Sequence, residues 1–246
     1  MAAEIKYPRK QLIRKVLKGG IAFAFNFLAD VKVVGKENLP AGGPLLVVAN
    51  HFNFMDPLFL IHTSPWPMEF VGGAKMPNAP RIVHFLQRLF GVIPTYRGTG
   101  ARGTLKVAES ILRQDGVLAI FPEGGSWAAV LRPARPGTAF LAWRTNASVI
   151  PIGIHGSDTF WKQVRTQKRA QVTLTIGKPF GPFNSSGASR PGRDELDQIG
   201  ESIMRHIADQ LPQENAVATP TTPPSARLPA APRSTPGLTK LKANDD

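Results

Sequence analysis

Short apolar runs recur along the chain and are separated by stretches with helical spacing. Most of these runs are apolar at consecutive positions, which is typical of strands that are covered on both faces. They are bounded by glycine, proline or polar residues, as strands in a folded domain usually are. The runs that predict strands are residues 31–35, 45–49, 69–71, 92–95, 117–121, 149–154 and 172–176.

The stretches between the strands predict helices over residues 57–62, 81–90, 101–114 and 138–145. A last helix is expected from about residue 194 to 211, where Pro212 ends it. Strands that alternate with helices indicate an α/β fold with helices on the faces of the sheet. We therefore expect a single α/β domain over residues 31–212, with a mixed, mostly parallel sheet of about seven strands.

The first 30 residues combine an amphipathic pattern with many cations. Leu12, Ile13, Val16 and Leu17 recur at helical spacing and predict a helix over residues 8–29, which Gly19-Gly20 should break or kink. Two interpretations are open, a helix docked on the core or an interfacial membrane anchor. The excess of lysine and arginine favours the anchor. The cations of this segment are Lys6, Arg9, Lys10, Arg14, Lys15 and Lys18.

In the anchor, Phe23, Phe25 and Phe27 are expected to dip below the lipid headgroups. Removing residues 1–29 should then weaken membrane association. The apolar stretch 21–29 is far shorter than the roughly 20 residues that a membrane-spanning helix needs. At the other end, residues 213–246 are rich in Ala, Pro, Thr and Ser, and we expect this tail to be disordered.

Composition narrows the possible partners. The net charge of +13 favours anionic lipid, phosphorylated small molecules or nucleic acid. Nucleic acid is the least favoured, because the basic residues are not interleaved with stacking aromatic residues in one platform. The chain has no cysteine, which excludes disulfides, thiolate catalysis and sulfur-ligated metals.

One histidine and one aspartate are placed to form a catalytic pair. His51 follows the strand 45–49, and Asp56 precedes Pro57, the expected first residue of a helix. A turn of this kind can bring the two side chains together. The aspartate then accepts from one imidazole nitrogen and leaves the other as a base for an alcohol. The alternative is that Asp56 only caps the helix.

Three further segments carry candidate chemistry. Strand 117–121 runs into Glu123-Gly124-Gly125-Ser126, a loop whose backbone amides can hold a phosphate or an oxyanion. Arg97 follows the strand 92–95 and offers a fork suited to phosphate. Pro151 lies within the strand 149–154 and predicts an edge or a bulge. Each segment has a plain alternative without function. The Glu123 loop is then a glycine turn with an exposed glutamate, Arg97 is a surface arginine, and Pro151 packs in the core.

In their order and spacing, these four segments resemble the four sequence blocks of the glycerolipid acyltransferases, the lysophosphatidate acyltransferases and their relatives. The first block is His, four residues and Asp, matched by His51 and Asp56. The second has an arginine after an apolar strand, matched by Arg97, and the third is Phe-Pro-Glu-Gly, matched without change by residues 121–124. Pro151 lies in the fourth, and the resemblance spans about residues 39–178.

The resemblance implies a role for each matched residue. His51 would be the general base on the acceptor hydroxyl, and Asp56 would orient it. Arg97 and the loop from Glu123 to Ser126 would hold the phosphate and glycerol of the acceptor. The strand of Pro151 would line the acyl path.

The resemblance also implies the partners. The donor would be acyl-coenzyme A or acyl carrier protein, and the acceptor a membrane lysophospholipid such as 1-acylglycerol-3-phosphate. The family uses no metal, no cofactor and no covalent acyl-enzyme. With the basic N-terminus, this implies a peripheral or monotopic protein on the cytoplasmic face of a membrane, contacting its anionic surface.

The sequence departs from the family pattern after Phe-Pro-Glu-Gly. The family usually continues with a Thr-like residue and then Arg or Ser, whereas Gly125, Ser126 and Trp127 follow here. Where an arginine is expected, a phosphate ligand is missing, and Arg132 and Arg135 are the candidates to replace it. The departure bears on the acceptor headgroup and not on the reaction type.

Three other functions compete with acyl transfer. A hydrolase can use the same histidine–aspartate pair to activate water, but a Gly-x-Ser-x-Gly nucleophile motif is missing. A non-catalytic basic membrane-binding protein does not need the four ordered blocks. A metalloenzyme using His51, Asp56 and Glu123 has one histidine in its set, and His62, His84 and His155 are not spaced as ligands on one element.

Overall fold

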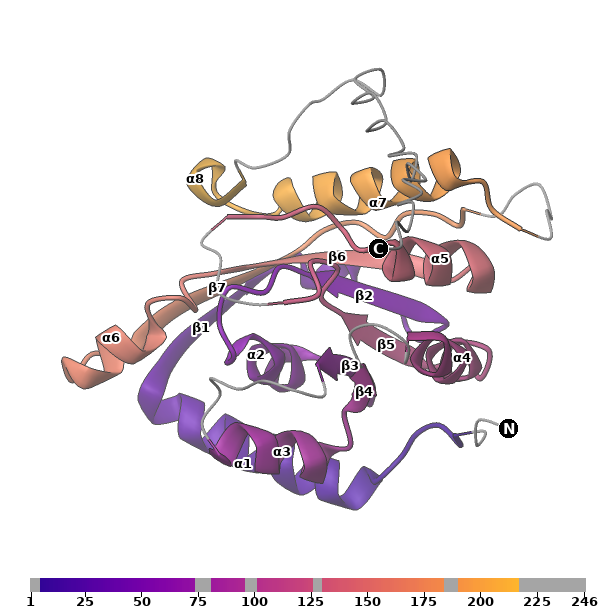
Figure 1. The fold of residues 1–246 in the computed structure, drawn as a ribbon. Helices are drawn as coiled ribbons and strands as arrows, with labels where there is room; N and C mark the ends of the chain where they lie inside the picture. The colour runs from indigo at the N-terminus through magenta and orange to yellow at the C-terminus, as the bar shows by residue number, and fades with distance from the viewer. Residues whose placement is uncertain (1–4, 74–80, 96–100, 126–129, 184–189, 217–246) are drawn as a thin grey trace, which may run out of the picture.

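A seven-stranded sheet lies at the centre of the protein in the computed structural model (Figure 1). The structure describes residues 5–73, 81–95, 101–125, 130–183 and 190–216. The strands are β1 (Ala29–Val34), β2 (Leu45–Ala49), β3 (Met68–Gly73), β4 (Ile93–Thr95), β5 (Val117–Ile120), β6 (Ser148–His155) and β7 (Ala170–Ile176). Their order across the sheet is β1-β7-β6-β2-β5-β3-β4, and only the pair β6–β7 is antiparallel. The prediction of a mixed, mostly parallel sheet of about seven strands is confirmed.

Helices cover both faces of the sheet. One face carries α1 (Gln11–Leu28), α2 (Asp56–Thr63) and α3 (Arg81–Phe90), and the other carries α4 (Ala101–Leu112), α5 (Pro136–Thr145) and α7 (Arg193–Ala208) (Figure 1). Three short helices were not predicted, α6 (Phe160–Arg165), α8 (Gln213–Ala216) and the 3₁₀ helix η1 (Lys36–Asn38). Because α8 lies inside the segment expected to be a disordered tail, the folded part reaches at least Ala216.

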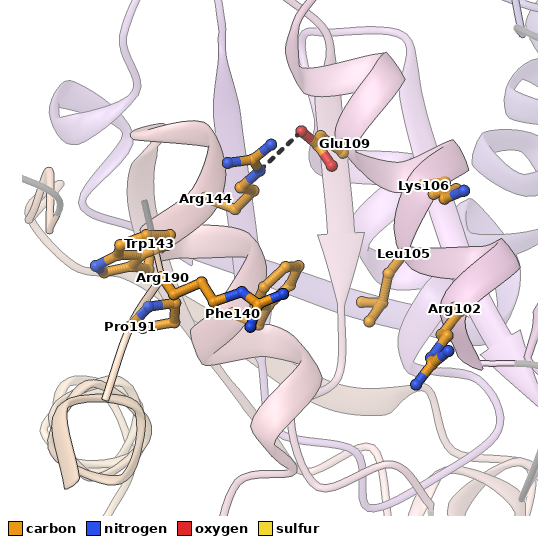
Figure 2. A pocket seen from close by; sticks show the side chains of 9 residues that line it. All are labelled: Arg102, Leu105, Lys106, Glu109, Phe140, Trp143, Arg144, Arg190 and Pro191. Carbon is orange, nitrogen blue, oxygen red and sulfur yellow. Dashed lines mark hydrogen bonds and ion pairs between the residues drawn. The ribbon is translucent and has the colours of Figure 1, made fainter. Parts of the chain in front are cut away.

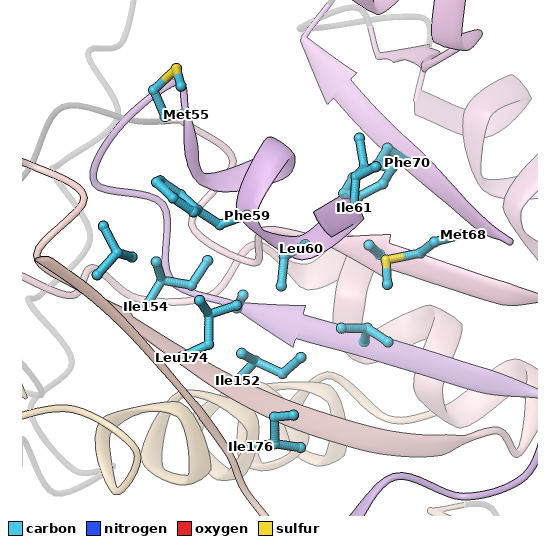
Figure 3. Packing of buried hydrophobic residues seen from close by; sticks show 14 of the residues in the cluster. Met55, Phe59, Leu60, Ile61, Met68, Phe70, Ile152, Ile154, Leu174 and Ile176 are labelled. Atoms are coloured by element: carbon cyan, nitrogen blue, oxygen red, sulfur yellow. The ribbon is translucent and has the colours of Figure 1, made fainter. Parts of the chain in front are cut away.

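The two faces explain the continuous apolar runs in the sequence. Every residue of β2 is buried. Leu45, Val47 and Ala49 belong to the core beneath α1 and α2, whereas Leu46 and Val48 belong to the core beneath α4, α5 and α7. Figure 3 shows the first of these cores, where Leu60 of α2 lies over strands that carry Ile152 and Leu174. Both sets of β2 side chains must therefore be apolar.

The first helix is continuous, so of the break or kink predicted at Gly19-Gly20 the break does not occur. Each interior glycine costs a helix about 1 kcal/mol relative to alanine. Tertiary contacts on either side of the glycines hold this helix together: Arg14 and Phe25 are both buried against the rest of the protein. Packing of this kind, rather than intrinsic propensity, supplies most of the stability of helices in folded proteins.

One of the three phenylalanines that were expected to enter the membrane is part of the core. Phe25 is 3% exposed and stacks on Phe59 of α2, with the ring centroids 4.6 Å apart. Phe23 and Phe27 are 68% and 66% exposed. Arg14, counted above among the anchor cations, is also buried. The prediction for Phe25 is therefore wrong, and the helix both docks on the core and exposes apolar side chains.

Pro151 lies in β6, between β7 and β2, and so is not in an edge strand. Its carbonyl accepts the Gly177 N–H at 2.9 Å, so its own missing N–H also faces β7. The ladder is irregular at that point: Ile152 pairs with Ile176, but the bridge three residues earlier joins Val149 to Phe180. The proline thus occupies an interior strand opposite a bulge, and the bulge alternative of the prediction is confirmed.

Candidate active site

The chain leaves two neighbouring strands at one edge of the sheet and turns to opposite faces. β2 and β5 are parallel, with Val48 opposite Ile120. β2 leads into α2 on one face, whereas β5 leads into α5 on the other. Open α/β sheets bind their ligands beyond the carboxyl ends of the strands, where the connections diverge in this way. His51 and Glu123 follow these two strands, and the structure brings them together.

The histidine and aspartate of the first block form a direct pair. His51 Nδ1 lies 3.0 Å from Asp56 Oδ2, and the same carboxylate oxygen accepts the Asn53 N–H at 2.8 Å. The Asp56 side chain is fully buried, whereas that of His51 is 15% exposed. When Nδ1 donates to the aspartate, Nε2 carries the lone pair. The pair therefore presents one basic nitrogen at the protein surface.

Asp56 does not cap the following helix. Helix α2 begins at Asp56 itself, the residue before it makes no side-chain cap, and the carboxylate accepts from the preceding turn instead. The imidazole of His51 also stacks on Phe121, with the ring centroids 4.2 Å apart and the planes 20° apart. The carboxylate on one side and the aromatic ring on the other fix the orientation of the imidazole.

Glu123 is buried and joins two loops of the site, so the alternative of an exposed glutamate is wrong. One carboxylate oxygen accepts the backbone N–H of His51 at 3.1 Å, and the other accepts that of Arg132 at 3.2 Å. Burial raises the pKa of Glu123 above its usual range, although these two N–H donors and the charge of Arg132 act in the opposite direction. The glutamate thus ties the His51 turn to the loop after β5.

Two arginines fold over the turn at Gly124 and Gly125. Arg132 donates to the Gly125 carbonyl at 2.7 Å, and Arg135 donates through Nε to the Glu123 carbonyl at 3.3 Å. Gly124 has a φ of +66°, and a side chain there would collide with Arg135. Two guanidinium groups, from residues 132 and 135, thus lie beside the turn after which the family pattern leads one to expect a cation.

The backbone donor expected at Gly124 is already used in the turn. Its N–H donates to the Phe121 carbonyl at 3.0 Å, so the prediction that this amide binds an anion is wrong for this conformation. Arg97 and Ser126 lie outside the described residues. Pro151 is buried beside Val48, three residues before His51.

Asn50 is a structural partner of the site that the sequence reasoning missed. Its side-chain amide donates to the Ile154 carbonyl at 2.8 Å, and its carbonyl oxygen accepts the Ile154 N–H at 2.7 Å. The residue is fully buried. It therefore fixes the end of β2 to β6 immediately before His51. The one sequence signal was a polar residue closing an apolar strand.

Comparison with known proteins identifies the family. The acyltransferase family model matches residues 30–155. A 1-acyl-sn-glycerol-3-phosphate acyltransferase of Bacillus subtilis is 23% identical over 180 residues, covering 73% of this chain and 87% of that protein. One of Borreliella burgdorferi is 26% identical over 140 residues, and the chain spans just over half, 56%, of its length.

A solved structure shares the fold. The 1-acyl-sn-glycerophosphate (LPA) acyltransferase PlsC of Thermotoga maritima superposes with a TM-score of 0.56 at 21% identity, over 83% of both chains. The resemblance inferred from the four sequence blocks is thereby confirmed at the level of the family. Because the family model matches just over half of the chain and includes His51, Asp56 and the Phe-Pro-Glu-Gly segment, the chain belongs to the acyltransferase family.

Proposed function

We propose that the protein transfers a fatty acyl group from acyl-coenzyme A or acyl carrier protein to a hydroxyl of a lysophospholipid such as 1-acylglycerol-3-phosphate. One observation carries the proposal: the buried Asp56 carboxylate holds the partly exposed His51 imidazole at the carboxyl edge of the sheet. Relatives at 23–26% identity are named for this reaction. Family membership supports acyl transfer, and the site geometry supplies a base that can take a proton from a hydroxyl.

In the proposed reaction, His51 acts as a general base. Its Nε2 takes the proton of the acceptor hydroxyl as that oxygen attacks the thioester carbonyl. Asp56 stabilises the resulting imidazolium. The carbon–sulfur bond then breaks, the new ester forms, and the leaving thiolate recovers the proton from Nε2. General-base help of this kind is typically worth about 10²–10⁴-fold.

The acceptor phosphate is proposed to lie over the Gly124-Gly125 turn. Arg132 and Arg135 already contact the carbonyls of this turn and bring two guanidinium groups to it. Guanidinium groups match a phosphate through paired hydrogen bonds. Arg97 and Ser126 are proposed to complete the set, while Glu123 holds the turn against His51. The strand of Pro151 is proposed to line the acyl path from within the sheet.

We propose that α1 and α3 form the membrane-facing surface, on the cytoplasmic side. The two helices pack side by side (Figure 1). Leu12, Val16, Phe23 and Phe27 form an exposed apolar stripe along α1, and Ile82 and Phe85 are exposed on α3. Lys15, Arg81 and Arg88 are exposed beside them. No helix within the described ranges is long and apolar enough to cross a bilayer.

This surface also defines the proposed organisation of the chain. The exposed stripe of α1 contacts the membrane, and the acyltransferase domain extends from β1 to α8, so residues 29–30 and 213–216 belong to the domain rather than to the anchor and the tail. Deleting residues 1–29 is a poor test of membrane contact, because Phe25 and Arg14 belong to the core. Substitutions confined to the exposed apolar stripe separate membrane contact from folding.

We expect the double variant Phe23→Gln/Phe27→Gln to bind anionic vesicles at least tenfold more weakly than the wild type. Burying one phenylalanine in an apolar phase is worth about 1.5–3 kcal/mol, and two are lost here. Flotation with phosphatidylglycerol vesicles measures the change. Val34→Gln, at an exposed apolar position on β1, is the control and should bind normally. Equal binding by the double variant and the wild type would rule out the stripe as the contact.

Acceptor choice should depend on Arg97 and Ser126. We expect Arg97→Ala to raise the KM for the acceptor much more than the KM for the donor, because it removes a phosphate ligand. Ser126→Arg should shift preference toward 1-acylglycerol-3-phosphate, since a charged hydrogen bond is roughly twice as strong as a neutral one. Steady-state kinetics with two acceptors measures both effects. An unchanged ratio of the two kcat/KM values in Ser126→Arg would show that this loop does not read the headgroup.

The proposed function is tested by following thioester loss from an acyl-coenzyme A, and separately from an acyl carrier protein thioester, with and without a lysophospholipid. Acyl transfer requires that thioester loss depend on the acceptor. A hydrolase would consume the thioester at the same rate in its absence. Acceptor-independent loss from both donors would therefore overturn the proposal.

A further inference from the structure

A cleft of about 370 Å³ opens between α4 and α5, next to the segment that leads into α7 (Figure 2). Phe140 of α5 lies between its two walls. Arg102 and Lys106 come from α4, whereas Arg144 and Arg190 come from α5 and from the segment before α7. The cleft therefore combines an aromatic ring with cations on both sides.

The charge of the cleft is strongly unbalanced. Glu109 is the one acid among the residues that line it, all of which the structure describes. This carboxylate is shared between Arg144 at 3.2 Å and Arg113, outside the cleft, at 2.7 Å. Arg102 and Lys106 are both exposed on the opposite wall. An anion that enters the cleft thus meets an excess of positive charge from three segments of the chain.

One end of the cleft points toward the edge of the sheet that carries the candidate active site. Helices α4 and α5 both start at the edge of the sheet that carries His51 and Glu123, since each follows a strand that ends there. Arg102 is the second residue of α4. From Arg102 to Glu109 the cleft extends along α4 for about 10 Å, at 1.5 Å per residue. A ligand seated in it has one end toward this edge of the sheet and the other end away from it.

We propose that this cleft binds the phosphorylated adenosine end of a coenzyme A thioester, an inference that rests on the proposed function. Its volume lies in the range of small-molecule sites, roughly 300–1,000 Å³. The ring of Phe140 offers a surface on which adenine can stack, and guanidinium and ammonium groups suit its phosphates. The pantetheine arm then runs toward His51 and presents the thioester there.

The same features favour coenzyme A over an acyl carrier protein as the occupant. A specific protein–protein contact typically buries about 800 Å² on each partner. A concave cleft between two helices, with one aromatic ring and a few cations, matches a nucleotide better than a protein surface. In this assignment, recognition of the donor depends on its nucleotide, and the acyl carrier protein is the alternative that the test must separate.

The test compares two donors that carry the same acyl group, acyl-coenzyme A and acyl-pantetheine, which lacks the nucleotide. We expect Arg102→Ala/Lys106→Ala to lower kcat/KM for acyl-coenzyme A by at least about tenfold, the usual effect of losing charged hydrogen bonds. With acyl-pantetheine, the wild type and the variant should be equal. Titration calorimetry with adenosine 3′,5′-bisphosphate should show binding to the wild type and much weaker binding to the variant.

The control variant is Arg165→Ala/Lys168→Ala, which removes two exposed cations around α6, remote in sequence from the cleft. It should behave as the wild type with both donors. Equal losses with both donors, equal losses in the control, or no loss at all would overturn the cleft assignment. Transfer from acyl carrier protein alone would also overturn it, while leaving acyl transfer itself intact. No transfer from any donor would instead reject the proposed function.

Discussion

Replacing His51 by alanine is expected to lower kcat for acyl transfer by about 10²–10⁴-fold, the usual contribution of a general base. The loss should appear in kcat rather than in either KM, because the imidazole acts on the proton and does not hold the phosphate. Initial rates with a saturating thioester donor and lysophospholipid measure it. The His51 side chain is 15% exposed and its loss leaves the buried Asp56 carboxylate without the imidazole, so we expect the free energy of unfolding to fall by about 1–3 kcal/mol.

Two further variants make the result specific. Asp56→Asn removes the charge that stabilises the imidazolium, and it should also lower kcat severely. His206→Ala removes an imidazole from α7, on the opposite face from α2, where it stacks on Phe180. This control should keep the wild-type kcat. A folded His51→Ala protein with near wild-type kcat would contradict the general-base role.

Replacing Glu69 by alanine is expected to lower the free energy of unfolding by about 3–5 kcal/mol, the usual cost of leaving a buried charge without its partner. Glu69 is fully buried in β3. Its two carboxylate oxygens accept from Arg14 Nη1 and Nη2 at 2.6 and 2.7 Å, and Arg9 adds two further hydrogen bonds through Nε and Nη2. Arg14 also lies over the Phe90 ring. The substitution would therefore leave a buried guanidinium, which joins α1 to β3, without its carboxylate partner.

Urea denaturation measures this loss, and a double variant tests its cause. Arg14→Met/Glu69→Leu removes the two buried charges and should be much less damaging than Glu69→Ala, because the remaining Arg9 is 22% exposed and also donates to the Gly91 carbonyl. Glu109→Ala, which breaks more exposed ion pairs, should cost less than about 1 kcal/mol. A double variant as unstable as Glu69→Ala would show that lost packing, and not the unpaired Arg14, causes the loss of stability.

The same ion pair has a predictable pH dependence. Burial alone raises the pKa of Glu69, but hydrogen bonds from Arg14 and Arg9 and their charges outweigh it, so the pKa lies below its usual range. Glu69 therefore binds fewer protons in the folded state. Its stabilisation is complete above the ordinary carboxyl pKa and is lost as the pH falls through the lower folded value. The stability difference between wild type and Glu69→Ala should thus shrink in acid.

The strands were predictable because their signal is local. β2 reads as five consecutive apolar residues, since its side chains alternate between two cores that are both dry. The sequence could also have predicted that Phe23 and Phe25 lie on opposite sides of the helix. Residues four apart, such as Phe23 and Phe27, share a helix face, whereas residues two apart do not. Treating the three phenylalanines as one apolar group missed this periodicity.

Other features depend on contacts that one sequence does not display. Arg14 and Glu69 are 55 residues apart, and the pattern around Arg14 reads equally well as a basic surface. The His51–Asp56 pair was predictable because one turn contains both residues. The bond from His51 to Glu123 spans 72 residues and requires β2 and β5 to be neighbours. The hydrophobic pattern does not give the order of the strands in the sheet. Only the family resemblance suggested that His51 and Glu123 lie in one site.

Mass spectrometry of the lipid products tests the central claim most directly. Purified protein would be given labelled acyl-coenzyme A and acyl carrier protein thioesters in separate reactions, each with an equimolar panel of lysophospholipids. We predict a labelled diacyl phospholipid from at least one donor, formed by the wild type and not by His51→Ala. Labelled free fatty acid as the one product, with every lysophospholipid left unchanged, would contradict acyl transfer by this site.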